Sequence, residues 1–371
     1  MRAAAQRCGV SLHDDVYGAQ SRIESPTTAK VKLAEGALAW LPGLCVLRLD
    51  GDDALRFLHS QTTNDLLQQP PDAARWHGYC SPKGRLLATM LIWRDGASVR
   101  LLLPDSVAAT IGRRLKMFVL RSKVRITNES GALAVLGVIG DAGADALQRL
   151  HVAAPAPMKV VVADGTVDAN APRDPSAPRL TAIGLPPLPA DPSSGIATDV
   201  PRWLLVVPAE SVEGAWRALQ ARLAPTDSRT WRWTDVRSGI ASIVPATSEQ
   251  FVPQMLNLEA EAIGAVSFTK GCYPGQEVVA RSHYLGKTKR RTFLARIGGT
   301  AGSTPREPFP GSDVVDAAGQ PVGLVVTAAP SPDGAVDVLF EAQVAAAKQG
   351  ELAVDGQALQ PLALPYTVPP E

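Results

Sequence analysis

Residues 86–103 read LLATMLIW-RDGA-SVRLLL, which is two apolar runs separated by the short polar turn Arg94-Asp-Gly-Ala97. Two runs of strand length around an Asp-Gly pair predict a β-hairpin. A hairpin pairs its strands in antiparallel fashion, so this stretch argues against an all-parallel sheet.

Strands and helices alternate on both sides of this hairpin. Residues 43–51, GLCVLRLDG, place apolar side chains at alternate positions and predict a strand, and a helix over 54–61 follows. Residues 105–120 have helical spacing, and 132–140 and 141–150 predict a further strand and a further helix. Together with the hairpin, this mixture predicts the α+β fold class.

The two ends and one internal stretch differ from this pattern. Residues 1–36 are predicted to be a disordered tail, and the short β-type runs within 286–371 predict a small C-terminal β-barrel or sandwich. Residues from about 152 to 201 are dense in proline, which disfavours long helices and central strands. We therefore expect loops and short edge strands in that insert.

Composition and charge exclude several classes of protein. The 371 residues suffice for two or three domains, and 46% hydrophobic with 20% charged residues is ordinary for a soluble globular protein. Lys+Arg is 37 and Asp+Glu is 36. This balance argues against a dedicated DNA-binding or membrane-surface protein, because both need an excess of positive charge. No apolar run reaches the roughly 18 residues needed to span a bilayer.

The N-terminus, MRAAAQRCGVSLHDD, lacks the apolar stretch of a secretory signal. It contains Arg and Ala and has no acid before Asp14, which leaves a mitochondrial presequence as an alternative. Because the stretch is short and is followed by Asp14-Asp15, we expect a cytoplasmic protein, with the mitochondrial matrix as the alternative.

The four cysteines, Cys8, Cys45, Cys80 and Cys272, are scattered, and none belongs to a Cys-x-x-Cys pair. A disulfide framework, or a zinc or iron–sulfur site held by this chain alone, is therefore not expected. Cys45 alternates with the apolar residues of a predicted strand and is interpreted as structural. We expect reduced thiols, each to be judged by its own surroundings.

Cys272 has unusual surroundings, Phe268-Thr-Lys-Gly-Cys-Tyr-Pro-Gly-Gln-Glu277. It lies between Gly271 and Gly275, and Pro274-Gly275 suits the central positions of a type II turn. Such a loop lets the backbone approach a ligand closely and presents the thiol outside the core. The alternative is that Cys272 is a small buried hydrophobe, as free cysteines often are. The turn residues around it disfavour that alternative.

Charged and polar neighbours support a reactive thiol. Lys270 and Arg281 can supply the positive potential that favours a thiolate, and Gln276 and Glu277 supply hydrogen-bond acceptors.

At this point the sequence resembles the YgfZ family, folate-binding relatives of the glycine-cleavage T-protein. The family motif KGCYxGQE matches Lys270, Gly271, Cys272, Tyr273, Gly275, Gln276 and Glu277. Three further segments match, namely FLHSQTTNDL (57–66), YCSPKGRLLA (79–88) and QFVPQMLNLE (250–259). The resemblance covers roughly residues 40 to 365 and is weakest in the proline-rich insert.

The resemblance implies a T-protein-like ring of three domains. Two α+β folate-binding domains would be interleaved within residues 37–285, and residues 286–371 would form the C-terminal β-barrel. It further implies bound tetrahydrofolate or a related folate. The implied role is an accessory factor in iron–sulfur cluster assembly or repair that supports tRNA thiomethylation, with iron–sulfur assembly proteins or client enzymes as partners.

The resemblance also assigns residues. Cys272 matches the family's functional cysteine, Trp231 matches a tryptophan associated with folate, and Asn64 is a polar candidate for the folate channel. A buried core aromatic is the alternative for Trp231, and Trp233 could take its place. The T-protein's catalytic carboxylate has no counterpart, because no acid lies between Ser81 and Arg94. Whether the chain is an enzyme therefore stays open, and aminomethyl transfer is disfavoured.

A basic run, KTKRR (287–291), follows the cysteine loop together with Arg281 and His283. A solvated surface is the usual meaning of such a run. Attraction of folate polyglutamate, an acidic partner or RNA phosphate is the functional alternative. Three functions compete: an iron–sulfur factor acting through Cys272, a folate-dependent one-carbon transferase, and an RNA-binding module. We expect no metal site, no DNA partner and no membrane partner, and RNA contact stays open.

Overall fold

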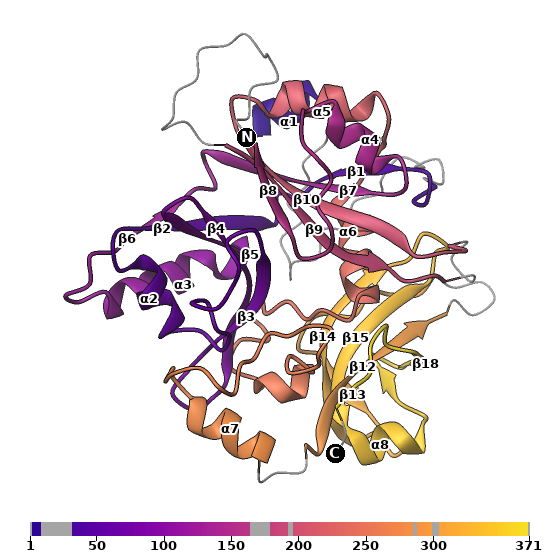
Figure 1. Ribbon diagram of the computed structural model, residues 1–371. Coiled ribbons are helices and arrows are strands. Elements are labelled where there is room, and N and C mark those ends of the chain that lie inside the picture. Colours follow the sequence, from indigo (N-terminus) through magenta and orange to yellow (C-terminus); the bar gives the residue numbers. More distant parts are fainter. Residues whose placement is uncertain are drawn as a thin grey trace.

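The structure is a computed structural model that describes residues 2–8, 32–163, 179–191, 196–284, 288–298 and 304–369. Figure 1 shows three sheets placed around a common centre, at the top, the left and the lower right of the view. Strands and helices are mixed throughout the described chain, which confirms the α+β class.

The six-stranded sheet has the order β11-β1-β7-β10-β9-β8. Only β1 and β11 pair in parallel, and the other neighbours are antiparallel. Helices cover its outer face at the top of Figure 1, where side chains of α1, α4 and α5 join one buried cluster with it. The elements are β1 (Ala37–Trp40), β7 (Leu133–Ile139), β8 (Val160–Ala163), β9 (Leu180–Leu188), β10 (Val200–Pro208), β11 (Ala224–Thr226), α1 (Arg2–Arg7), α4 (Gly143–Gln148), α5 (Val212–Gln220) and α6 (Ser228–Arg237).

The five-stranded antiparallel sheet, in the order β3-β4-β5-β2-β6, lies between β1 and β7 in the sequence. The chain therefore leaves the six-stranded sheet after one strand and returns to it later. The predicted hairpin is confirmed, since β4 and β5 pair from Leu91↔Leu102 to Asp95↔Ser98. The elements are β2 (Leu44–Asp50), β3 (Ala74–Cys80), β4 (Leu86–Asp95), β5 (Ser98–Pro104), β6 (Arg125–Asn128), α2 (Ala54–His59) and α3 (Asp105–Phe118).

The C-terminal sheet has seven strands in the order β17-β16-β13-β14-β15-β12-β18. It curls into a nearly closed, barrel-like sheet at the lower right of Figure 1, which confirms the predicted β-barrel. Its interior is filled by its own apolar cluster. The elements are β12 (Arg290–Ile297), β13 (Asp313–Val315), β14 (Pro321–Pro330), β15 (Val336–Gln343), α8 (Val344–Gln349), β16 (Ala353–Val354), β17 (Gln357–Ala358) and β18 (Gln360–Leu362).

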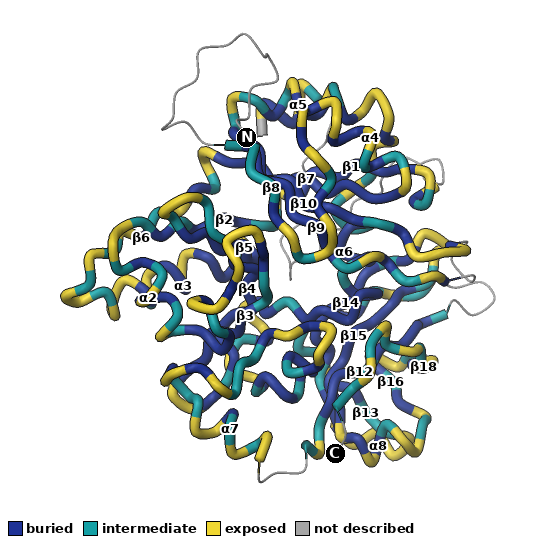
Figure 2. Tube along the Cα trace, in the orientation of Figure 1, coloured by how far each residue is buried: buried dark blue, intermediate teal, exposed yellow. Residues whose placement is uncertain are grey.

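One buried cluster joins the three sheets. Trp93 on β4, Ile139 on β7 and Leu339 on β15 all belong to it, and Trp231 and Trp233 on α6 lie within it. Figure 2 shows the strands around the centre as mostly buried, with exposed residues gathered on the outer helices and loops. The arrangement of the three units therefore depends on shared burial of apolar surface.

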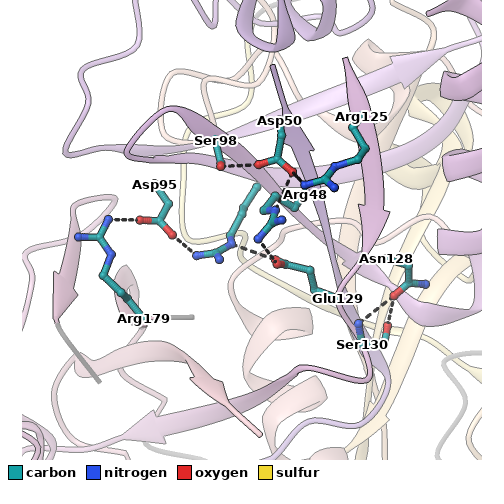
Figure 3. Close-up of polar contacts among 10 residues, drawn as sticks. Arg48, Asp50, Asp95, Ser98, Arg125, Asn128, Glu129, Ser130 and Arg179 are labelled. Atoms are coloured by element: carbon teal, nitrogen blue, oxygen red, sulfur yellow. Dashed lines mark hydrogen bonds and ion pairs between the residues drawn. The ribbon is translucent and has the colours of Figure 1, made fainter. Parts of the chain in front are cut away.

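Ion pairs add a second connection. Arg100 on β5 is buried and pairs with Asp95 and with Glu129, and Asp95 in turn pairs with Arg179, which directly precedes β9. Figure 3 shows this chain of contacts. Arg179 thus joins the six-stranded sheet to the hairpin of the five-stranded sheet.

The prediction for the proline-rich insert was wrong in one respect. β9 has nine residues and pairs with β10 on one side and with β8 on the other, so it is not an edge strand. Pro186 and Pro187 lie at its C-terminal end, beyond the Leu180–Ile183 segment that pairs with β8. The prolines therefore remove no ladder hydrogen bond from the doubly paired part. Residues 164–178 and 192–195 of the insert lie outside the described residues.

Part of the predicted disordered tail is helical. α1 packs against α5, with Ala4 and Ala5 buried, and the Arg7 Nε donates to Glu213 at 2.7 Å. Residues 9–31 lie outside the described residues. Among the described helices, none is long and apolar enough to cross a membrane.

Candidate functional site

The loop around Cys272 has the turn that its residues predict. The Tyr273 carbonyl accepts from the Gln276 amide at 3.2 Å, and Gly275 has φ of +81°. These are the features of a type II turn with Pro274 and Gly275 at its centre. The turn leads directly into α7 (Gln276–Tyr284).

Cys272 is exposed, whereas the other three cysteines are not. Cys45 and Cys80 are buried, and desolvation raises the pKa of the Cys45 thiol to about 11 and that of Cys80 to about 12. Both therefore stay protonated at neutral pH. Cys8 is partly exposed, and burial raises its pKa as well. Exposure thus distinguishes Cys272 from every other thiol of the chain.

Two of the matched segments meet at a pair of glycines. A methyl group at Gly275 would lie 2.5 Å from the Ser81 carbonyl oxygen and 2.6 Å from the Gly84 Cα. Gly84 also has a positive φ of +70°, and a methyl group there would lie 2.8 Å from the Val278 Cβ. The backbones of the PKGR turn and of the cysteine loop are therefore in direct contact, which only residues without a Cβ allow.

Lys270 connects the loop to the third matched segment. Its ammonium group donates to the carbonyl oxygens of His59, of Thr62 at 2.5 Å and of Asn64 at 3.2 Å, and it lies 5.1 Å from the centre of the Tyr273 ring. Burial lowers the pKa of Lys270 to about 8, so the group is still charged at neutral pH.

These contacts give Lys270 a different role from the one that its position in the sequence suggests. No hydrogen bond or ion pair in the described part of the chain joins it to Cys272. It holds the loop against residues 59–64. The pKa of Tyr273, which is buried beside it, is raised by desolvation.

Asn64 lies behind the same loop. Its side-chain amide donates to the carbonyls of Trp76 at 3.0 Å and Gly264 at 2.6 Å, and its oxygen accepts from the Asp65 amide at 2.8 Å. Every polar atom of this buried side chain is thus used within the protein. Its contacts join Gly264 to β3 at Trp76, and a role in a folate channel stays a prediction.

The start of α7 carries the rest of the motif. Glu277 and Arg281 are exposed and Gln276 is partly exposed, so these side chains surround the loop at the surface. The His283 ring stacks on Phe268 with centroids 3.7 Å apart. Among the described residues no group of three or more His, Cys, Asp and Glu side chains is arranged to hold a metal.

Trp231 is buried, with 1% of its surface exposed. Its ring packs on Gly137 of β7, and the Arg202 guanidinium lies over the ring at 5.5 Å. Trp233 is also buried and donates from Nε1 to Asp337 at 2.8 Å. These are the contacts of core aromatics. A pterin could stack on this face of Trp231 only if Arg202 moved. The folate role of Trp231 therefore stays a prediction, and it requires that movement.

Three buried hydrogen-bond acceptors without partners lie within residues 253–259. The family resemblance includes this segment, but it assigned no role to any single residue there. Gln254 Oε1, Asn257 Oδ1 and Glu259 Oε2 have no hydrogen-bond partner in the described part of the chain. The other polar atoms of these side chains donate to Val279 and Thr292 and accept from Arg291. Unpartnered buried acceptors call for an explanation in a native protein, and a bound water or another bound molecule would supply the missing donors. The matched segment QFVPQMLNLE was the signal that pointed to them.

The two arginines of the basic run after the loop are paired with acids. Arg290 pairs with Glu341, and the nearly buried Arg291 pairs with Glu259. Lys287 lies outside the described residues. Acids from distant parts of the sequence therefore neutralise these two arginines, whereas Lys289, Arg281 and His283 are exposed, so for those residues both expectations, a solvated surface and an anion-attracting one, stay predictions.

The chain has relatives among proteins of known name. No protein-family model matches the chain. It is 33% identical over 281 residues to the tRNA-modifying protein YgfZ of Edwardsiella ictaluri, which covers 74% of this chain and 72% of the relative. It is 28% identical over 329 residues to the tRNA-modifying protein YgfZ of Yersinia pseudotuberculosis, covering 87% and 90%.

Among solved structures, the chain is similar to the glycine cleavage system aminomethyltransferase T from Bartonella henselae. The TM-score is 0.61 with 14% sequence identity, and the match covers 90% of this chain and 87% of the other. At this identity the likeness shows the fold alone. It confirms the expected T-protein-like architecture.

Proposed function

Because the chain belongs to the YgfZ family of tRNA-modifying proteins, we propose that it is a folate-binding accessory factor for iron–sulfur cluster assembly or repair. In this proposal it acts through Cys272 and supports tRNA thiomethylation. The observation that carries the proposal is the position of Cys272, the one exposed thiol of the chain, on a loop held by Gly84 and Lys270. A fixed, accessible thiol is suited to sulfur and iron chemistry.

Two kinds of step are open to one such thiol. As a ligand, Cys272 would supply one of the thiolates of a cluster whose other ligands come from a partner protein. As a nucleophile, it would attack the outer sulfur of a partner's persulfide. The partner's S–S bond then breaks, a bond to Cys272 Sγ forms, and the partner cysteine leaves as thiolate.

The chemistry of the 253–259 segment fits a folate. A pterin ring presents an amino group and ring N–H groups as donors, and the unpartnered oxygens of Gln254, Asn257 and Glu259 are acceptors. We propose that these residues hold the pterin, with Trp231 and Asn64 as further candidates. Bound folate would supply a one-carbon carrier.

A folate-dependent one-carbon transferase is the second candidate function, and the T-protein-like fold favours it. The absence of an acid between Ser81 and Arg94 disfavours it, because T-protein chemistry uses a carboxylate there. Iron–sulfur assembly proteins or their client enzymes are the proposed partners, and a cytoplasmic location, as in bacteria, is part of the proposal.

Replacing Cys272 by alanine should abolish function. In a strain that lacks the endogenous protein and is under oxidative stress, the activity of an iron–sulfur enzyme should fall by at least about tenfold relative to the wild-type gene, because the reacting sulfur is gone. Folding and tetrahydrofolate binding should stay near normal, since the side chain is exposed. The activity of the iron–sulfur enzyme in cell extracts checks this.

Cys8→Ala is the matched control, because it removes a thiol that is also partly exposed but lies outside the motif. It should restore full enzyme activity. Full rescue by Cys272→Ala would remove the proposed role, and turnover of a folate-bound one-carbon donor by the purified protein would favour the transferase instead.

Tetrahydrofolate binding should depend on the acceptors of residues 253–259. Gln254→Met keeps the side-chain length and the Arg291–Glu259 ion pair but removes the Oε1 acceptor together with the Nε2 donor to the Val279 carbonyl. It should weaken binding by about 1–3 kcal/mol, since a buried donor of the ligand loses its partner. Isothermal titration calorimetry measures this, and Gln250→Met, on an exposed side chain four residues earlier, is the control.

The same titration tests Trp231. If its ring stacks on the pterin, Trp231→Ala should also weaken binding by about 1–3 kcal/mol. Unchanged affinity in Gln254→Met would reject the acceptor site, and unchanged affinity in Trp231→Ala would reject stacking.

A further inference from the structure

One segment on the outer side of the five-stranded sheet is rich in basic residues. Residues 106–128 contain six basic residues and no acid, although the whole chain carries a net charge of only +1. This stretch runs from α3 to β6, and Figure 1 shows α2 and α3 together on the outer side of the sheet, at the left of the view. Positive charge is therefore concentrated on one side of an otherwise balanced protein.

Three of the six cations are free to meet an outside partner. Arg113, Lys116 and Arg121 are exposed and make no ion pair with any residue that the structure describes. Lys123 and Arg125 are exposed and contact Asp52 at 3.3 Å and Asp50 at 3.4 Å, the second of which is visible in Figure 3. The Lys123–Asp52 pair is exposed on both sides and therefore holds Lys123 weakly.

The same surface presents apolar side chains. Seven large hydrophobic residues are exposed in the described chain, and three of them lie within four positions here, Met117 at 65%, Phe118 at 43% and Leu120 at 88%. Leu120 has φ of +40°, a conformation that costs free energy for a residue with a side chain. An exposed aromatic ring among cations is the combination that stacks on an unpaired base while arginine and lysine contact phosphates.

Helix α2, on the same side of the sheet as α3, contacts the cysteine loop. Arg56 on the adjoining helix α2 is exposed, and His59, the last residue of that helix, accepts from the Lys270 ammonium through its carbonyl. A long polyanion on α3 would thus pass α2 toward Cys272.

We propose that the surface formed by α3, the loop after it and β6 binds RNA, with Arg113, Lys116 and Arg121 at the phosphates and Phe118 against an unpaired base. This proposal rests on the proposed function, in which the chain supports tRNA thiomethylation. RNA is favoured over an anionic membrane because Lys123 and Arg125 extend the cations beyond the three apolar residues to β6, and because the exposed Phe118 ring suits stacking on an unpaired base.

Binding of purified bulk tRNA to the full-length protein, measured by fluorescence anisotropy at several salt concentrations, tests the proposal. The triple variant Arg113→Gln, Lys116→Gln, Arg121→Gln should lose at least about tenfold in affinity at 0.1 M salt, and the slope of log K against log salt should decrease by about two to three. Phe118→Ala should lose about five- to 150-fold with an unchanged salt slope, because stacking releases no counterions.

The matched control removes three exposed arginines in or directly after α4 and α5, on the outer side of the six-stranded sheet, Arg149→Gln, Arg217→Gln and Arg222→Gln. It has the same change in net charge and should bind tRNA as the wild type does. Equal binding by the two triple variants would overturn the proposal, as would a wild type that fails to bind tRNA. Binding to phosphatidylglycerol vesicles that is lost in Leu120→Ser, without tRNA binding, would identify a membrane surface instead.

The tRNA-binding test and the Cys272→Ala test of the proposed function can fail independently of each other. If Cys272→Ala loses activity while both triple variants bind tRNA equally, only the RNA surface is rejected. If Cys272→Ala rescues fully, the proposed function fails whatever the tRNA measurements show.

Discussion

Gly275→Ala should lower the free energy of unfolding by about 2–5 kcal/mol and abolish complementation although Cys272 is still present. The added methyl group would lie 2.5 Å from the Ser81 carbonyl oxygen, 2.6 Å from the Gly84 Cα and 2.7 Å from the Gly84 amide nitrogen. All three are main-chain atoms, so no side-chain rotation relieves the overlap. The φ of +81° adds the cost of a left-handed conformation for a residue with a Cβ.

Gly271→Ala is the control for this experiment. Gly271 lies in the same loop, but a methyl group there would meet no atom within 4 Å, and its φ is outside the left-handed range. It should change the unfolding free energy by less than about 0.5 kcal/mol and leave complementation intact. Urea denaturation provides the measurement. If the two variants were equally stable, the contact between the PKGR turn and the cysteine loop would not hold the loop in place.

Gly84→Ala extends the test to the other side of the contact. The double variant Gly84→Ala, Gly275→Ala should cost less than the two single changes together, because each removes the same approach of the two backbones.

Local patterns in the sequence were enough to predict much of the fold. The hairpin predicted over 86–93 and 98–103 is observed as Leu86–Asp95 and Ser98–Pro104, and the helix predicted from 105 begins at Asp105. Periodicity and turn residues specify such elements within a short window. The place of β9 could not be predicted in this way, because its pairing with β10 depends on burial in the whole sheet.

The candidate site also combines local features that the sequence predicts with non-local contacts that it does not. The type II turn at Pro274-Gly275 follows from two neighbouring residues, and it is observed. The direction of the Lys270 ammonium depends on carbonyls about 200 residues earlier in the chain, and the acids that neutralise Arg290 and Arg291 are equally non-local in origin. Contacts of this kind require the tertiary structure, and sequence spacing does not show them.

A buried carboxylate connects the C-terminal sheet to the rest of the molecule. Asp337 on β15 is fully buried, and its oxygens accept from Arg296 Nε at 2.7 Å, Arg296 Nη2 at 3.1 Å and Trp233 Nε1 at 2.8 Å. Arg237 on α6 approaches it to 3.8 Å. β12, β15 and α6 therefore meet at one carboxylate, and Trp231 lies on the same helix.

Asp337→Ala should lower the free energy of unfolding by about 3–5 kcal/mol, because it removes the closest acid of the buried Arg296 and the acceptor of Trp233 Nε1. Asp333→Ala is the control: Asp333 contacts the same Arg296 at 3.0 Å, but its side chain is 30% exposed. That change should cost less than about 1 kcal/mol, since water replaces the lost contact. Urea denaturation of both variants decides the matter. If Asp337→Ala were no more costly than Asp333→Ala, the apolar core would hold the C-terminal sheet without this ion pair, and the position of α6 would not depend on it.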